Sequence, residues 1–306
     1  MNYPYANGII SVIENKVLDR NKLYVLSKYE KKEFIKVLLA MNYGGSGETL
    51  EDLIASENNR VKDLLKEISP KKEDTNLFYL VNDAQNIKIL YKIKVYNLDK
   101  YDLLSENGTM DLEILSQAII DNNFTNAPKR LKELVTKINS HLTDDINPKN
   151  LSSLIDNSIY SYAIKATNNH TLKKYLTYRI DFNNVISMLR SKNLNWNKSE
   201  YFKMFLDNGS ISKNVLENVY EASKEELIKC LEVFYDGKIS KVLKKITSLD
   251  ECQLEFERLM LELMKEYKNE PLNIGPVIYY YLLKQAEAQN IRILYSLDKV
   301  DIKDLL

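Results

Sequence analysis

Glycine and proline are scarce in this 306-residue sequence, which contains 8 Gly and 6 Pro, although the two together usually make up about 12% of a protein. Both residues interrupt helices and build turns. Their scarcity argues against a β-sandwich, a β-barrel or a loop-rich α/β fold and favours long helices. No run of about 18 or more apolar residues is present, so no membrane-spanning helix is predicted. The first residues lack the pattern of a signal peptide.

A net charge is also missing, because 43 Lys and Arg residues balance 43 Asp and Glu residues. A dedicated nucleic-acid-binding protein would carry excess basic residues to neutralise phosphates, so no nucleic-acid partner is expected. The two cysteines are too few for a disulfide framework. Cys230 and Cys252 lie in apolar helical patterns, and we interpret both as reduced core residues of a cytoplasmic protein.

Recognisable catalytic patterns are absent from the sequence as well. Its two histidines, His141 and His170, are isolated, whereas a zinc site needs three or four clustered ligands. The glycine-rich segment 44–49 lacks the lysine of a phosphate-binding loop, and no hydrophobic strand precedes it. We therefore expect no metal, no cofactor, no small-molecule substrate and no active site, and interpret segment 44–49 as a loop that leads to a helix capped by Thr49.

Apolar residues recur with helical spacing through almost the whole chain. Phe34, Val37, Leu38 and Met41 fall on one helix face. The apolar run 277–283 follows Gly275-Pro276, and a proline at a first helical position favours a helix there over a buried strand. Three successive tyrosines in this run cannot all face outward, so core positions are the favoured interpretation. The sequence predicts an all-α protein.

A nine-residue motif occurs twice and returns a third time in diverged form. Segments 83–91 and 287–295 are identical at seven of nine positions, and segment 181–189 is the weaker copy. The Asn residues of the three copies, at positions 86, 184 and 290, are 98 and 106 residues apart. An Asn-Gly dipeptide stands at a similar distance before each copy, at positions 7, 107 and 208. A long internal period indicates repeated units, and we predict three similar helical domains, at residues 1–104, 105–206 and 207–306, around a pseudo-threefold axis.

The acidic residue and the Asn of each copy are three positions apart, so they share one helix face. One interpretation is structural: the acid and the amide anchor the helix to a neighbouring loop, because buried amides are usually satisfied within the protein. The other interpretation is that Asn86, Asn184 and Asn290 face a common axis and contact a partner there. Arg190 and Arg292, which lie close to the motif, are candidates for the same interface or for a solvated helix face.

The repeated motif and the C-terminal region resemble a known family. Asp-x-x-Asn helices occur at 83–94 and 181–192, and an aliphatic-rich helix is followed by Lys-x-x-Glu-x-x-Asn-Ile-Arg at 284–292. This pattern is similar to that of the C subunit of the V/A-type rotary ATPases and ATP synthases, which is called the d subunit in the eukaryotic vacuolar enzyme. The resemblance covers the whole chain.

The resemblance implies a funnel of three helical domains that forms part of the rotor. Such a protein lies on the cytoplasmic face of the membrane-embedded proteolipid ring, receives the tip of the central stalk in its socket, and couples ion translocation to ATP synthesis or hydrolysis. It has no active site of its own. A helical-repeat scaffold for soluble partners is the alternative function, and an enzyme that acts on a phosphorylated ligand at segment 44–49 is a third.

Overall fold

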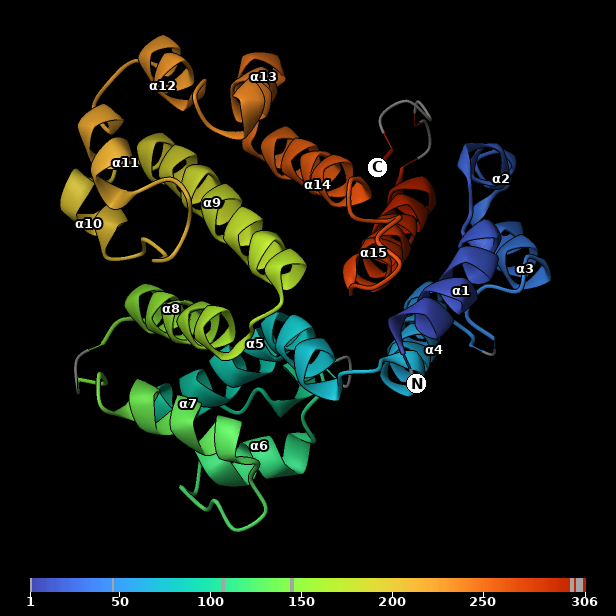
Figure 1. Cartoon of the computed structure of the whole chain (residues 1–306), viewed down its shortest axis with the longest axis horizontal. Helices are drawn as coiled ribbons and strands as arrows, with labels where there is room; N and C mark the ends of the chain where they lie inside the picture. Colours follow the sequence, from blue (N-terminus) through green and yellow to red (C-terminus); the bar gives the residue numbers. More distant parts are fainter. Residues whose placement is uncertain (1, 46, 106–107, 144–145, 298–299, 301–304) are drawn as a thin grey trace. The chain divides into compact units, whose positions relative to one another are not determined.

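The computed structural model describes residues 2–45, 47–105, 108–143, 146–297, 300 and 305–306, without the side chains of residues 81 and 82. This part of the chain consists of helices and their connections and contains no β-strand. The predicted all-α class is therefore confirmed. The residues form two compact units, one made of Met1–Thr75 and Met260–Leu306 and the other of Asn76–Leu259. Figure 1 labels the helices of both units.

The first unit combines the two ends of the sequence. Its helices are α1 (Tyr3–Ile13), α2 (Arg20–Leu26), α3 (Lys31–Ala40), α4 (Leu50–Ile68) and α15 (Gly275–Ser296), with the 3-10 turn η1 (Glu14–Lys16). The second unit contains α6 (Leu112–Ile119), α7 (Lys129–Asn139), α8 (Pro148–Ala166), α9 (His170–Asn193), α10 (Lys198–Phe202), α11 (Lys213–Val219), α12 (Lys224–Leu231) and α13 (Lys238–Lys245), with η2 (Tyr101–Leu103) and η3 (Tyr235–Gly237). The two-unit boundaries fall within α5 (Lys72–Tyr96) and α14 (Leu249–Lys265).

Helix lengths recur in the same order along the chain. Helices α2 to α5 have 7, 10, 19 and 25 residues, and α6 to α9 have 8, 11, 19 and 24 residues. A third succession begins with α11 and ends with α14 and α15, which have 17 and 22 residues. Each succession ends with a long helix that carries one copy of the motif.

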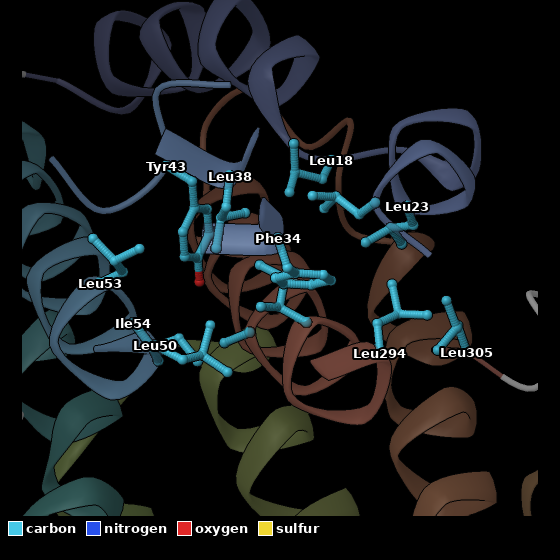
Figure 2. Close-up of a cluster of buried hydrophobic side chains, with 13 residues drawn as sticks. Leu18, Leu23, Phe34, Leu38, Tyr43, Leu50, Leu53, Ile54, Leu294 and Leu305 are labelled. Carbon is cyan, nitrogen blue, oxygen red and sulfur yellow. The ribbon is translucent and has the colours of Figure 1, made fainter. Parts of the chain in front are cut away.

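The core of the first unit lies between α2, α3, α4 and α15. Phe34 lies in the middle of the cluster drawn in Figure 2, with leucines of the neighbouring segments around it. Helix α15 begins where Gly275-Pro276 predicts. A Cβ on Gly275 would lie 2.3 Å from the Tyr267 carbonyl oxygen, so only glycine allows this close approach. Tyr279, Tyr280 and Tyr281 are all buried, as expected for core residues.

In the second unit, α7 packs on α8 and α8 packs on α9. The inward faces of these helices are aliphatic, with Leu131, Leu151 and Leu176 fully buried. Asn147 caps α8 by accepting a hydrogen bond from the Asn150 N–H, and Pro148 takes the first helical position. Both cysteines are free; Cys252 is buried, as expected, whereas Cys230 is only half-buried.

Candidate functional site

The first copy of the motif, on α5, holds the segment that follows its own helix. The Asn86 amide donates to the Ser105 carbonyl oxygen at 2.6 Å and accepts from the Ser105 N–H at 2.9 Å. One turn earlier, the Asp83 carboxylate accepts the Thr109 N–H at 2.7 Å and the Met110 N–H at 3.2 Å. The acid and the amide therefore anchor the start of the next helical succession to α5. We call such an arrangement a clasp.

The second copy, on α9, forms the same clasp. Asn184 donates to the Leu206 carbonyl at 2.9 Å and accepts from the Leu206 N–H at 2.8 Å. The Asp181 carboxylate accepts the Ser210 N–H at 2.9 Å and the Ile211 N–H at 3.0 Å. It also accepts a short hydrogen bond from the Tyr235 hydroxyl. Both acids are buried, and this burial raises the pKa of the Asp83 and Asp181 carboxyls despite the hydrogen bonds that favour their ionised forms.

The third copy, on α15, uses a glutamate and joins the two ends of the sequence. Asn290 donates to the Leu306 carbonyl at 3.1 Å and accepts from the Leu306 N–H at 2.7 Å. The Glu287 carboxylate accepts the Leu18 N–H at 2.6 Å. Leu18 and Glu287 are 269 positions apart, so this clasp joins segments that are remote in sequence. We call it the seam.

The three carboxylates hold equivalent points of the chain. Leu18, Met110 and Ile211 each directly precede the residue that caps a short helix, namely α2, α6 and α11. All three are buried apolar residues. Each acid therefore fixes the start of a short helix. The seam fixes the start of α2, just as the other two clasps fix the starts of α6 and α11.

The glycines of two of the three Asn-Gly dipeptides are explained by this geometry. A Cβ on Gly108 or Gly209 would lie 2.1 Å from a carboxylate oxygen of Asp83 or Asp181, so the loops need glycine to approach the acids. Asn107 lies outside the described residues. Asn7-Gly8 lies inside α1, and a Cβ on Gly8 would meet nothing within 4 Å. Asn7-Gly8 therefore forms no turn equivalent to the other two, and Asn7 instead contacts the backbone of segment 270–273.

Lysines downstream of the motif complete the first two clasps. The Lys94 ammonium donates to the Ile119 carbonyl at the end of α6, and the Lys192 ammonium donates to the Ala222 carbonyl just after α11. A cation at a helix C-terminus satisfies carbonyls that have no partner within the helix. Helix α6 is thus held at both ends by the motif helix that precedes it, whereas Lys192 holds the connection that follows α11.

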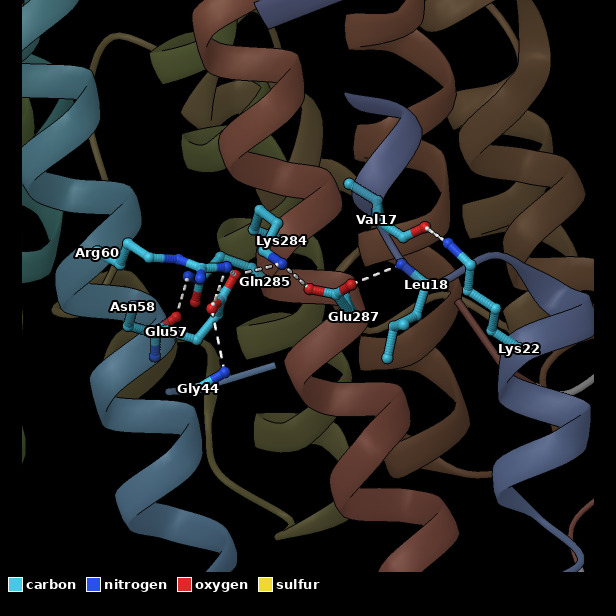
Figure 3. A network of polar contacts seen from close by, with 10 residues as sticks. All are labelled: Val17, Leu18, Lys22, Gly44, Glu57, Asn58, Arg60, Lys284, Gln285 and Glu287. Carbon is cyan, nitrogen blue, oxygen red and sulfur yellow. Dashed lines mark hydrogen bonds and ion pairs between the residues drawn. The ribbon is translucent and has the colours of Figure 1, made fainter. Parts of the chain in front are cut away.

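At the seam, a buried network of ion pairs adds a further attachment between α15 and α4 (Figure 3). The Lys284 ammonium on α15 lies 2.7 Å from Glu57 of α4 and also pairs with Glu287. The second oxygen of Glu57 accepts the Gly44 N–H at 3.2 Å. The side chains of Lys284, Glu57 and Glu287 are only 6%, 3% and 1% exposed. We call these three residues the seam triad.

The two carboxyls of the seam triad respond differently to burial. Desolvation alone would raise the pKa of Glu57, but the Lys284 ammonium, with help from Arg60 and the Gly44 N–H, holds it below its usual value. Burial dominates at Glu287 and raises the pKa of its carboxyl despite Lys284 and the Leu18 N–H. A buried charge without a partner is very unfavourable. The Lys284 ammonium therefore makes it possible to bury the Glu57 and Glu287 carboxyls side by side.

The five residues predicted at a partner interface fall into two groups. Asn86, Asn184 and Asn290 are only 1%, 1% and 3% exposed, and their amides are engaged by backbone groups. The structural interpretation of the motif is therefore confirmed. Arg190 and Arg292 are exposed. Arg190 donates to Gln253 at 2.9 Å, and Arg292 forms a two-bond pair with Glu51. Contact of any of the five with a partner stays a prediction.

Segment 44–49 has no free phosphate-binding cradle among its described residues, which exclude Ser46. The Gly44 N–H is bound to Glu57, and Thr49 and Asp52 close the start of α4 with a reciprocal capping box. Glu51 and Asp52 lie in the first turn and would repel an anion. Among the residues that the structure describes, no group of three or more His, Cys, Asp or Glu side chains is placed to hold a metal ion.

The family pattern includes the lysines that end segments 83–94 and 181–192, as well as Lys284 and Glu287, but the sequence did not show what any of them binds. It gave no sign of the roles of Leu18 and Glu57. A signal for part of the triad exists, because Lys284 and Glu287 are three positions apart on one helix. Nothing near Glu57 or Leu18 marks them as its partners. The equivalence of Leu18 with Met110 and Ile211 becomes visible only in the structure. There Asp19, Asp111 and Ser212, the residues that follow them, each cap a short helix.

The comparison with known families decides the identity of this helical framework. Residues 6–297 match the model of the ATP synthase (C/AC39) subunit. The chain belongs to this family. Similar proteins include the C subunit of the A-type ATP synthase of Pyrococcus abyssi, with 21% identity over 98% of this chain and 88% of the relative. The C subunits of Haloquadratum walsbyi and Methanosarcina acetivorans are 23% and 22% identical over 93% and 100% of this chain and 83% and 91% of the relative.

Membership of the C/AC39 family confirms the predicted resemblance. The family is a structural subunit of a rotary ATP synthase and not its catalytic subunit, in agreement with the functional class that we expected. Within the described helices, none is both long and apolar enough to cross a bilayer.

Proposed function

We propose that this C/AC39 protein is the rotor adaptor that joins the proteolipid ring of the membrane sector to the central stalk. In this role it lies at the cytoplasmic, inner face of the membrane and couples ion translocation to ATP synthesis or hydrolysis. The observation that carries the proposal is the family match over residues 6–297. The clasps also support the proposal, because they fasten successive helices to one another, and a protein that transmits torque must resist deformation between its helices.

We also propose that the chain is organised as three similar helical domains around a pseudo-threefold axis, in a funnel. The recurring helix lengths and the equivalent clasps support this organisation. They favour domain starts at Leu18, Met110 and Ile211 over the starts at 1, 105 and 207 that the motif spacing suggests. Helix α1 then precedes the first domain as an additional element.

Arg190 and Arg292 are the residues of the predicted interface that have side-chain surface available to a partner. Each lies on a motif helix, α9 and α15 respectively, and each arginine is exposed. An exposed arginine can exchange an internal partner for a carboxylate of another protein at little cost, because surface ion pairs contribute little stability. Asn86, Asn184 and Asn290 instead hold the framework that positions these arginines.

Native mass spectrometry of the tagged chain, purified gently with detergent from its own cells, tests the proposal. Recovery together with a multi-copy proteolipid ring, stalk subunits and ATPase head subunits is the expected result. If the chain is recovered alone, while intact ATPase complexes in the same lysate lack it, the rotor role is wrong and a helical-repeat scaffold becomes the better description.

A further inference from the structure

Helix α1 carries no charged residue, and the residues that it exposes are apolar apart from Ser11. The sequence Tyr3–Ile13 contains no Asp, Glu, Lys or Arg, whereas α2, α3, α4 and α15 of the same unit all carry charges. A surface helix normally presents a charged or polar face to water, and a helix that is apolar all round is normally buried. In this chain, only one face of α1 is covered.

The inner face of α1 is held rigidly. Its buried residues Ala6, Asn7 and Ile10 face the protein, and α1 packs on α15. The Asn7 amide lies within hydrogen-bond distance of the carbonyl oxygens of Glu270, Pro271 and Asn273, at 3.1, 3.0 and 3.2 Å. The helix is therefore fixed before any partner arrives, which lowers the entropic cost of binding.

The outer face of α1 consists of Pro4, Tyr5, Gly8 and Val12, which follow one another at helical spacing. All four residues are exposed, and the side chains of Tyr5 and Val12 are 56% and 66% exposed. This face thus presents an aromatic ring, a branched aliphatic side chain and bare backbone to solvent, with no charge among them. The exposed Ser11 lies beside it, and its hydroxyl donates to the Asn7 carbonyl within the helix. We refer to these four residues as the outer face of α1.

No contact among the described residues explains why position 8 is a glycine. Glycine weakens a helix interior relative to alanine, and it is normally retained where a side chain would collide or where φ is positive. A Cβ on Gly8 would meet nothing within 4 Å, and Gly8 is not among the residues with positive φ. The open position is suited to the close approach of another backbone, as small residues allow between packed helices.

We propose that the outer face of α1 is the docking site for an uncharged, apolar helix of another subunit of the ATP synthase. The inference rests on the proposed rotor function, which supplies the complex. A helix is the fitting occupant because the outer face is an apolar strip about 12 Å long, with a gap at Gly8 where a neighbouring side chain can enter. A lipid surface is disfavoured, because interfacial helices bind anionic headgroups through Lys and Arg, which α1 lacks.

Photo-cross-linking in the assembled complex tests this docking site. The photoreactive residue p-benzoylphenylalanine replaces Tyr5 in one variant and Tyr24 of α2 in a matched control, since the two tyrosines are 56% and 53% exposed. After irradiation of the purified complex, the variant at Tyr5 is expected to link to an apolar helical segment of another subunit, and the control is not. Links to lipid, to a second copy of this chain or to nothing would overturn the inference.

Two substitutions give an independent readout. Gly8→Ala is expected to raise the melting temperature of the isolated chain, because alanine favours the helix and has free space, and yet to weaken assembly. Val12→Arg is expected to weaken assembly about tenfold or more, whereas Val25→Arg, at an exposed valine of α2, is not. Unchanged assembly for both α1 variants contradicts the docking site. Recovery of the wild-type chain without any ATPase subunit contradicts the rotor function itself, so the two failures are distinguishable.

Discussion

The N–H of Leu18 donates to the carboxylate of Glu287 at 2.6 Å. This hydrogen bond fastens the start of α2 to α15 in the way that Asp83 and Asp181 fasten the starts of α6 and α11. In those two clasps the joined segments also follow one another along the chain, within 30 residues. The seam has no such short connection, and the additional buried pair between Lys284 and Glu57 compensates for it.

Loss of a clasp amide is expected to destabilise the protein. Asn184→Ala leaves the Leu206 N–H and carbonyl without their partners in a buried place. Each unsatisfied buried group costs about 1–3 kcal/mol, so the loss of both partners should lower the free energy of unfolding by about 2–6 kcal/mol, as measured by urea denaturation. Asn183→Ala is the matched control, because Asn183 is half-buried and its amide donates a long hydrogen bond to the Tyr160 hydroxyl at 3.3 Å. Equal stability of the two variants would show that the clasp is not needed for folding.

The seam triad is expected to depend on its central cation. Lys284→Met leaves the Glu57 and Glu287 carboxylates buried without their shared partner, and breaking a buried pair in this way typically costs about 3–5 kcal/mol. The triple variant Lys284→Met, Glu57→Gln, Glu287→Gln removes the charges and keeps acceptors for the Gly44 and Leu18 N–H groups. It should recover much of the lost free energy of unfolding in urea titrations. A single Lys284→Met variant as stable as the wild type would mean that the triad does not fasten the seam.

The pH dependence of stability should report the buried clasp acid Asp83. Because burial raises its pKa in the folded state, the folded protein binds the Asp83 proton more tightly than the unfolded chain does. The Asp83 contribution to the free energy of unfolding therefore falls as the pH rises from the ordinary carboxyl value, about 4, to the raised one, by up to about 1.4 kcal/mol per pH unit.

The variant Asp83→Asn isolates this contribution. The difference between wild-type and variant stabilities, measured by urea denaturation at a series of pH values, should change across that window and level off above it. Opposing contributions of Glu57 and Glu51, whose pKa values are lowered, cancel in the difference. A difference that does not vary with pH would show that Asp83 has the same pKa in the folded and unfolded chains.

Charge reversal separates the structural and partner roles of Arg292. Arg292 and Glu51 are 47% and 65% exposed, and exposed pairs contribute about 1 kcal/mol or less. Arg292→Glu should therefore leave folding almost unchanged but weaken assembly of the complex, as should Arg190→Glu. The swap Arg292→Glu with Glu51→Arg restores the internal pair and should not restore assembly. Normal assembly and coupled activity of the reversed variants would remove both arginines from the predicted interface.

The sequence was sufficient to predict the helical class, the start of α15 and the helical context of the repeated motif. These depend on local patterns, such as the spacing of apolar residues and the position of Pro276. The sequence could not predict which backbone groups bind the acidic residues of the motif. A carboxylate can accept a hydrogen bond from any nearby N–H, and the pattern does not show which loop lies next to the carboxylate. Asn7-Gly8 shows the same limit: a dipeptide typical of turns stands inside a helix, where its Asn binds carbonyls of residues more than 260 positions away.

Coupling between ATP hydrolysis and ion transport tests the central claim most directly. Complexes depleted of this chain and reconstituted in vesicles are compared with the same complexes after the purified chain is added back, with both activities measured in parallel. The rotor-adaptor role predicts that depleted complexes hydrolyse ATP without moving ions and that the added chain restores transport. Ion transport driven by ATP at the full rate in complexes that lack the chain would contradict the role.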